Sequence, residues 1–263
     1  MTTILAKILD AKKGEIEQML LRAIPDQAEI IVRPSLFDAL YQSERLQVIS
    51  EIKRASPSKG LIAEGINPAD QASQYVEAGA ACISVLTDTP FFQGTFDDLA
   101  EVARTISIPV LCKDFIIHPI QIDYAKHAGA SVVLLIVAAL EQEKLLSLYK
   151  YAVSKGLEVL VEVHDSVELD LALQLDAKLI GVNNRDLRTF DVDLSRTAEI
   201  AAIFPFEEER VLISESGIWD SADAVKVASF GASAVLVGES LMRSGEVGNT
   251  LQSLQVKREV ITP

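Results

Sequence analysis

The sequence predicts a single (β/α)8 barrel, the TIM-barrel class of α/β fold, preceded by a helical extension. Three observations lead to this prediction: short apolar runs recur along the 263 residues, segments with helical end signals separate them, and successive runs lie 20 to 33 residues apart. That spacing and a total of about 250 residues are typical of this fold. A doubly wound open sheet is the alternative, but it would usually carry a glycine-rich turn directly after the first strand, and the sequence has none there.

The eight apolar runs predict the strands. Each is rich in Val, Ile and Leu and apolar on both faces, which is typical of strands in a buried parallel sheet. They are Val48–Ile52, Cys82–Leu86, Pro109–Cys112, Val132–Val137, Val159–Val163, Leu179–Val182, Val211–Ile213 and Ala234–Val237.

The segments between these runs predict helices. We expect them at residues 67–77, 118–129, 141–155, 166–173, 195–203 and 221–228. The last three begin with Ser166, Ser195 and Ser221, which we expect to act as N-caps. Before the first strand, the pattern predicts an amphipathic helix over residues 3–21 and a short one over 34–41. We therefore divide the chain into a helical extension, residues 1–46, packed on a barrel, residues 47–263, as one domain overall.

Composition excludes several classes of function. The chain carries 24 basic and 38 acidic side chains, a net charge of −14, which argues against binding nucleic acid or an anionic membrane surface. The two cysteines, Cys82 and Cys112, lie in predicted strands and cannot form a disulfide scaffold. With neither a secretory signal nor a long apolar segment in the sequence, we expect a cytoplasmic protein.

Charged residues gather where the predicted strands end. Active sites of these barrels lie at the carboxyl ends of the strands. Glu51 and Lys53 share a face of the first strand, Lys113 ends the third, Glu162 lies in the fifth and Asn183 ends the sixth. Such charges are rarely buried unless they are paired or functional. A catalytic site is the interpretation we favour, and a structural ring of salt bridges is the alternative.

The ends of strands seven and eight predict a phosphate site. They carry Ser216-Gly217 and Gly238-Glu239, and barrels of this class often bind phosphate there through backbone N–H groups. Ordinary loop glycines are the alternative. The three histidines share no ligand spacing with other donors, so we expect no metal site, and His164 is assigned no role.

Five motifs resemble the indole-3-glycerol-phosphate synthase family of tryptophan biosynthesis. They are Ile49-Ser-Glu-Ile-Lys-Arg-Ala-Ser-Pro-Ser-Lys-Gly60, Val110-Leu-Cys-Lys-Asp-Phe-Ile116, Leu160-Val-Glu-Val-His164, Ile180-Gly-Val-Asn-Asn-Arg-Asp-Leu187 and Ile213-Ser-Glu-Ser-Gly-Ile218. The resemblance spans essentially the whole chain, and the first motif is long and specific.

The resemblance implies a reaction and a set of site residues. The family is a group of lyases that close the indole ring of 1-(2-carboxyphenylamino)-1-deoxyribulose 5-phosphate with loss of CO₂ and water, without a metal or organic cofactor. Carried over by motif, Lys113 is the general acid, Glu162 serves the dehydration, Lys53 holds the substrate carboxylate, and Glu51 and Asn183 position them. The implied substrate-binding residues are Ser56, Phe92, Phe115, Arg185, Glu215, Ser216, Gly217, Gly238 and Glu239.

Two other functions stay open at this stage. One is a different phosphate-binding barrel enzyme, such as a phosphoribosyl isomerase, and the other is a non-catalytic barrel paralogue. The partner we expect is a small phosphorylated substrate rather than nucleic acid or membrane. We also expect a monomer, with docking by other enzymes of the tryptophan pathway left open.

Overall fold

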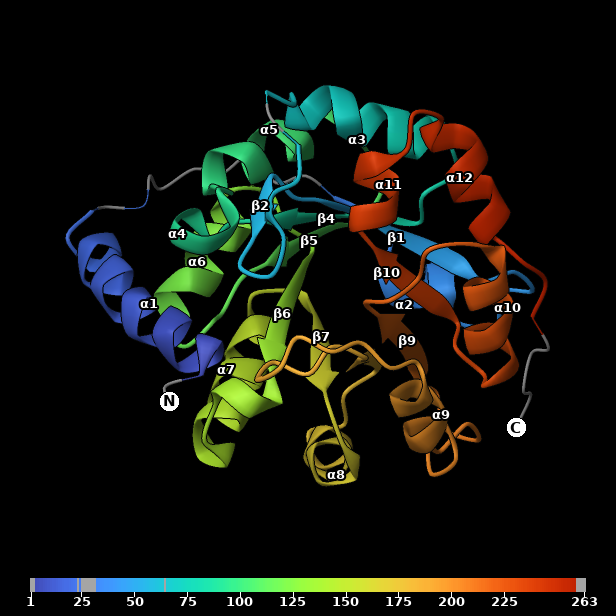
Figure 1. Cartoon of the computed structure of the whole chain (residues 1–263). Coiled ribbons are helices and arrows are strands. Elements are labelled where there is room, and N and C mark those ends of the chain that lie inside the picture. The colour runs from blue at the N-terminus through green and yellow to red at the C-terminus, as the bar shows by residue number, and fades with distance from the viewer. Residues whose placement is uncertain (1–2, 23, 25–31, 64, 259–263) are drawn as a thin grey trace.

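Eight parallel strands close into a barrel, in the computed structural model that describes residues 3–22, 24, 32–63 and 65–258 (Figure 1). The strands are β1 (Gln47–Ile52), β4 (Cys82–Leu86), β5 (Val110–Lys113), β6 (Val132–Ile136), β7 (Glu158–Val163), β8 (Leu179–Asn183), β9 (Val211–Glu215) and β10 (Ala234–Val237). They pair in chain order, and β10 closes the barrel against β1. The predicted fold class is confirmed, and each predicted run lies within two residues of an observed strand at both ends.

Helices surround the strands on the outside of the barrel (Figure 1). They are α3 (Pro68–Glu77), α5 (Phe96–Thr105), α6 (Pro119–His127), α7 (Gln142–Ser154), α8 (Ser166–Gln174), α9 (Ser195–Ala201), α10 (Ser221–Ser229) and α12 (Val247–Leu254). Shorter pieces lie at the strand ends: α4 (Thr89–Phe92), α11 (Glu239–Arg243), a 3₁₀ turn at Val137–Ala139, and a hairpin of β2 (Ala55–Ser56) and β3 (Gly60–Leu61).

The predicted serine caps are wrong by one residue. Asp165 and Asp220 are the N-caps of α8 and α10, and their carboxylates accept hydrogen bonds from backbone N–H groups of the first turn. An ionised carboxylate is the stronger acceptor at a helix N-terminus, so the serine that follows it becomes the first helical residue. Before α9 the cap is Leu194, and Asp193 Oδ1 accepts from the backbone N–H of Ser195 at 2.9 Å.

Helix α5 lies where the sequence analysis expected no helix. Thr95 and Asp98 form a capping box at its start, each side chain accepting from the other residue's backbone N–H. This spacing of Thr and Asp is a recognised start signal. Helix α5 connects β4 to β5 and completes the alternation of strand and helix.

Helix α2 (Leu36–Leu40) closes the end of the barrel opposite the site. Leu36 and Leu40 are fully buried and pack among side chains inside the barrel. The Glu158 carboxylate, at the start of β7, accepts hydrogen bonds from Ser35 Oγ and from the backbone N–H groups of Leu36 and Phe37 at 2.6–2.9 Å. This carboxylate fixes the helix against the strand ends, so the helix covers this end of the barrel.

Helix α1 (Ile4–Leu20) packs on α6 at the side of the barrel mouth (Figure 1). Its buried side chains are Ile8, Lys12 and Ile16, which lie on one face of the helix. Lys12 is 1% exposed and forms ion pairs with Glu15, Asp88 and Asp114 at 2.8–3.0 Å. Asp88 and Asp114 follow β4 and β5, so the extension is attached directly to the strand ends that form the site.

Candidate active site

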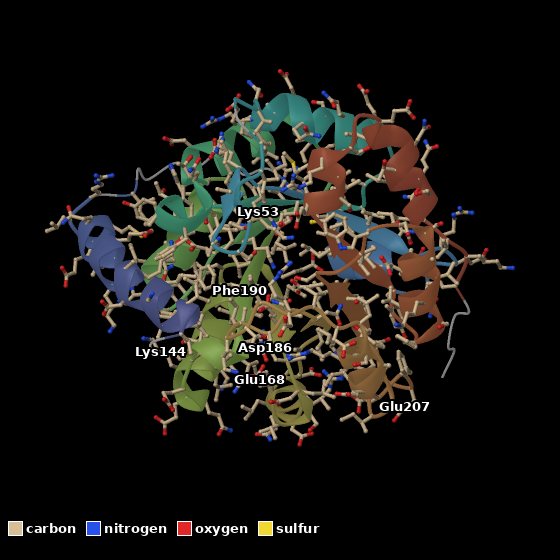
Figure 2. All side chains as sticks on the ribbon, in the orientation of Figure 1. Lys53, Lys144, Glu168, Asp186, Phe190 and Glu207 are labelled. Carbon is tan, nitrogen blue, oxygen red and sulfur yellow. The ribbon has the colours of Figure 1, made fainter. Side chains whose placement is uncertain are left out.

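One pocket opens at the carboxyl ends of the strands, as this fold predicts. Every candidate residue from the sequence analysis lines it: Glu51, Lys53, Ser56, Phe92, Lys113, Phe115, Glu162, Asn183, Arg185, Glu215, Ser216, Gly217, Gly238 and Glu239. Lys53 and Phe190 lie toward the middle of the molecule in Figure 2, whereas Lys144 and Glu207 lie at its edge. The contacts among the pocket residues determine which chemistry those residues can perform.

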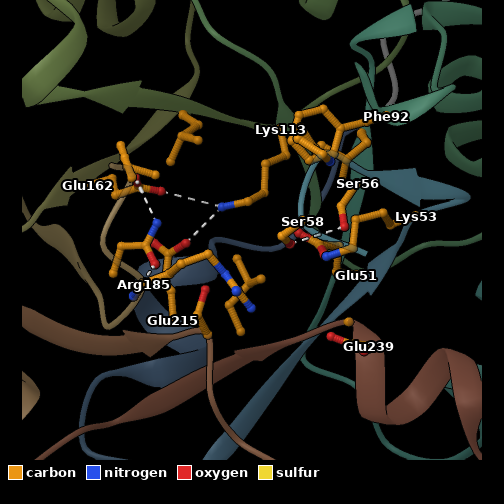
Figure 3. A pocket seen from close by; sticks show the side chains of 18 of the residues that line it. Glu51, Lys53, Ser56, Ser58, Phe92, Lys113, Glu162, Arg185, Glu215 and Glu239 are labelled. Carbon is orange, nitrogen blue, oxygen red and sulfur yellow. Dashed lines mark hydrogen bonds and ion pairs between the residues drawn. The ribbon is translucent and has the colours of Figure 1, made fainter. Parts of the chain in front are cut away.

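Lys113 occupies the middle of a group of carboxylates (Figure 3). Its Nζ lies 2.7 Å from Glu215 Oε2 and 3.6 Å from Glu162 Oε2. Burial alone would lower the pKa of Lys113, but the charges of Glu215, Glu162 and Glu51 outweigh it, and the pKa lies above its ordinary value. Lys113 is therefore charged at neutral pH, as a general acid must be before it donates.

Glu215 carries the opposite perturbation. Its side chain is 2% exposed, and burial raises its pKa to about 7, an effect that Lys113 only partly offsets. Glu215 shares the Lys113 ammonium group with Glu162, so the attraction does not cancel the cost of its burial. Glu215 can thus exchange a proton near neutral pH, in contact with the Lys113 ammonium group.

Lys53 and Glu51 form a second ion pair, on the opposite side of the pocket from Glu162 in Figure 3. Burial alone would raise the pKa of Glu51, but Lys53 and Lys113 outweigh it, and the pKa lies below its ordinary value. Glu51 is therefore a fixed carboxylate that holds Lys53. Lys53 remains 17% exposed, so its ammonium group can also reach a ligand.

Glu162 is held by its neighbours on two sides. Asn183 Nδ2 donates to Glu162 Oε1 at 3.1 Å, and the Asn183 side-chain oxygen accepts from the backbone N–H of Arg185 at 3.0 Å. The other carboxylate oxygen faces Lys113. Asn183 therefore orients the carboxylate and also the start of the loop that carries Arg185.

The chain turns sharply after β9, and a short helix follows β10, at the edge of the pocket. Ser216 and Gly217 have φ values of 67° and 85°, which turn the chain sharply after β9. A side chain at Gly217 would collide with Val192, and left-handed backbone at a serine is costly enough to cluster at functional sites. Glu239 begins α11, and its carboxylate is paired with Arg243 at 3.1 Å, so its backbone N–H is the group that it offers to a ligand.

The other end of the pocket is apolar and aromatic. The rings of Phe92 and Phe115 are 5.9 Å apart, and Ile4, Leu5 and Ile8 of α1 line the same pocket. Phe190 and Trp219 also line it, and the sequence analysis assigned neither to the site. Ser56, in β2, lies within hydrogen-bond range of Ser58 at 3.5 Å in the hairpin beside the pocket.

The histidines and cysteines form no metal centre in the described part of the chain. Across residues 3–22, 24, 32–63 and 65–258, no group of three or more His, Cys, Asp or Glu side chains has the geometry to hold a metal ion. Cys82 and Cys112 lie in β4 and β5, and both are buried free thiols. In the same residues, no helix has the length and apolar character to cross a membrane.

The fold and the site together are those of a (β/α)8-barrel enzyme with a pocket of ionisable side chains at its strand ends. A model of the family described as "Indole-3-glycerol phosphate synthase" matches residues 5–254. The chain belongs to this family, whose members are carboxy-lyases of tryptophan biosynthesis, and the resemblance seen in the motifs is confirmed.

Similar proteins extend over nearly the full length. An indole-3-glycerol phosphate synthase of Oceanobacillus iheyensis is 48% identical over 254 residues, 97% of each chain. One of an Exiguobacterium species is 50% identical over 252 residues, 95% of this chain and 96% of that one. Among solved structures, the tryptophan synthase α subunit of Legionella pneumophila aligns with a TM-score of 0.62 at 14% identity, covering 83% of this chain and 95% of that chain. That last likeness shows the fold alone.

Proposed function

We propose that this pocket closes the indole ring of 1-(2-carboxyphenylamino)-1-deoxyribulose 5-phosphate and releases CO₂ and water. The observation that supports it best is the Lys113 ammonium group between Glu162 and Glu215, with Lys53 across the pocket. Ring closure needs an acid at the ketone oxygen, and dehydration needs acid and base again. This group of residues supplies both within one pocket.

The proposed first step uses the two lysines. A bond forms between the ring carbon that bears the carboxylate and the ketone carbon, and the Lys113 ammonium protonates the ketone oxygen. Breaking the bond to the carboxylate releases CO₂, and its electron pair restores the aromatic ring. Lys53 holds the carboxylate until then, and Phe92 and Phe115 hold the aromatic ring against the apolar wall of the pocket.

The proposed second step uses Glu162. The new hydroxyl leaves as water while a proton is lost from the five-membered ring, with Glu162 as base or acid and Asn183 keeping its carboxylate in place. Glu51 positions Lys53, and Glu215 and Ser216 contact the polar middle of the substrate.

We assign the phosphate to the ends of β9 and β10. The backbone around Gly217, Gly238 and Glu239 lies at the usual phosphate position of such barrels, and Arg185 lines the same pocket. Ser56 contacts the substrate from the hairpin. We also propose that the protein is a cytoplasmic monomer: buried free thiols fit a reducing compartment, and the mass in solution tests the oligomeric state.

The test is turnover by the purified chain. Mixing it with the substrate should generate the fluorescence of an indole product together with CO₂. In Glu162→Gln, which keeps the shape but cannot exchange a proton, single-turnover quenching should show CO₂ released faster than indole forms. If CO₂ and indole instead appear together at one equally reduced rate, Glu162 acts at or before ring closure. Absence of product, with isomerisation of a phosphoribosyl substrate, would favour the isomerase alternative.

A further inference from the structure

His164 contacts the Glu162 carboxylate but is not among the residues that line the pocket. His164 is the first residue after β7. Because side chains alternate along a strand, it shares a face with Glu162, two residues earlier. Its Nε2 is 3.5 Å from Glu162 Oε1, whereas Lys113 faces Oε2 of the same carboxylate. Within the described residues this Nε2 is buried and has no hydrogen-bond partner. A buried nitrogen without a partner is costly, so its place beside a proton-exchanging carboxylate requires a reason.

The imidazole is held from its other side by Glu168 of α8. Glu168 Oε2 is 3.0 Å from His164 Nδ1, and it also accepts from the backbone N–H of His164 at 2.8 Å. A carboxylate at Nδ1 fixes the ring orientation and the tautomer, with the proton on Nδ1. In the neutral ring, Nε2 is then the unprotonated nitrogen, and it lies 3.5 Å from Glu162 Oε1.

Three carboxylates surround this imidazole. Glu168 comes from α8, Glu162 from β7 and Glu215 from β9. Burial alone would lower the pKa of His164, but these groups outweigh it, and the pKa lies above its ordinary value of 6.5. The ring therefore holds its second proton more readily than an unperturbed imidazole does.

We propose that His164 is a positioning and proton-storing residue for Glu162, through a Glu168–His164–Glu162 chain that ends at the reacting carboxylate. The proton moves from Oε1 of protonated Glu162 to Nε2 of neutral His164, which leaves a carboxylate beside an imidazolium, and the reverse transfer restores the acid. The Nδ1 proton stays on the bond to Glu168, and no other bond changes. Glu162 can thus exchange its proton while substrate or product fills the pocket. The inference rests on the proposed function in one respect, the proton exchange at Glu162.

The first test is the pH profile of kcat in His164→Gln. Glutamine still donates a hydrogen bond toward Glu162 but stores no proton. We expect kcat to fall about 10-fold, less than the roughly 10²–10⁴ of a direct acid–base group, with KM within about twofold. Losing the imidazolium should also move the acidic limb of the profile to higher pH, because a positive charge this close to Glu162 favours its ionised form. His127→Gln, the same change at the end of α6, is the control and should leave the profile unchanged.

A second variant separates the chain from simple loss of packing. Glu168→Gln keeps His164 but removes the charge at Nδ1, so it should shift the profile in the same direction by a smaller amount. Because the residues act in one chain, the double variant should be no slower than His164→Gln alone. Additive losses, or an unchanged profile in the folded single variants, would overturn the proposal.

The third measurement needs no substrate. The chain has three histidines, so the imidazole signal of His164 can be assigned by NMR and titrated. In Glu162→Gln, the pKa of His164 should fall, because one neighbouring charge is gone. An unchanged pKa would show that the two groups are not coupled. If the coupling is present but the wild-type chain forms no indole product, the proposed function fails and the His164–Glu162 chain remains.

Discussion

At the scale of single residues, Lys113 shows how burial and charge determine a proton donor. Its ammonium group is shared by Glu215 and Glu162, which raises its pKa and keeps it charged. Lys113→Gln removes the proton while keeping a polar side chain of similar reach. We expect kcat to fall by roughly 10²–10⁴, the range for a positioned acid.

Steady-state kinetics and a melting curve check this prediction together. Lys144→Gln makes the same change on exposed α7 and should leave both unchanged. Turnover near that of the wild type in a folded Lys113→Gln protein would remove Lys113 from the mechanism.

Gly181 of β8 makes room for the Glu215 carboxylate. A methyl group at this position would collide with Glu215 Oε1 and also press on Leu160. In Gly181→Ala the carboxylate must move, and its bond to Lys113 is lost. We expect kcat to fall roughly 10-fold or more, because misplacement of about 1 Å in a catalytic group is costly.

The control for this change is Gly14→Ala on α1, where a methyl group meets no atom within 4 Å. It should keep full activity and gain up to about 1 kcal/mol of stability from helix propensity. Unchanged kcat in Gly181→Ala would show that the position of Glu215 does not matter for the reaction.

At the scale of elements, α1 is part of the active site because of one buried ion-pair cluster. Lys12 contacts Asp88 and Asp114, and these carboxylates also accept from the backbone N–H groups of Phe91 and Phe115. Lys12→Met should leave the two buried carboxylates without their cation. We expect a loss of about 3–5 kcal/mol in the free energy of unfolding.

The same substitution should raise KM several-fold, because α1 and the Phe92–Phe115 wall depend on this cluster. Denaturant unfolding and steady-state kinetics measure the two effects. Lys13→Met is the matched control, because the Lys13 side chain is 69% exposed and pairs with exposed Asp10. Equal effects from the two variants would argue against a buried anchor.

The sequence predicted the strands of this barrel better than its helix ends and connections. Buried parallel strands are apolar on both faces, so the eight runs stand out from their surroundings. The caps were misplaced because Asp165-Ser166 and Asp220-Ser221 each offer two good capping residues in a row. Helix α5 was missed although Thr95 and Asp98 have capping-box spacing.

The site residues were also predicted unevenly from the sequence. The candidate residues, taken from the strand ends and from the family resemblance, all line one pocket. The contribution of α1 depends on how a distant helix docks, and a lysine such as Lys12 is normally read as a surface residue. His164 was assigned no role because its contact with Glu168 depends on how α8 packs beside β7.

At the scale of the whole molecule, an acidic protein gathers its cations where an anionic substrate would bind. The net charge is −14, yet Lys53, Lys113 and Arg185 all line the pocket. Glu51, Glu162 and Glu215 accompany them there, so the pocket is not a simple basic patch. Crowding these carboxylates into a buried site must therefore affect the stability of the entire fold as pH changes.

Glu215 gives this effect a definite sign. Its pKa is about 7 in the folded protein against an ordinary 4.5, so the folded state keeps a proton that the unfolded state releases between these values. The stabilisation is complete below pH 4.5 and is lost as the pH rises to 7, with a slope of up to about 1.4 kcal/mol per pH unit.

The Glu215→Gln variant lacks this proton, so it removes the effect. The free energy of unfolding of the wild type minus that of Glu215→Gln should therefore fall across this window and level off above it. Urea unfolding at several pH values measures this difference. For Glu207→Gln, at an exposed position, the difference should not change with pH. A flat difference for Glu215→Gln as well would mean that this carboxylate is ionised throughout the window, with Lys113 offsetting the full cost of its burial.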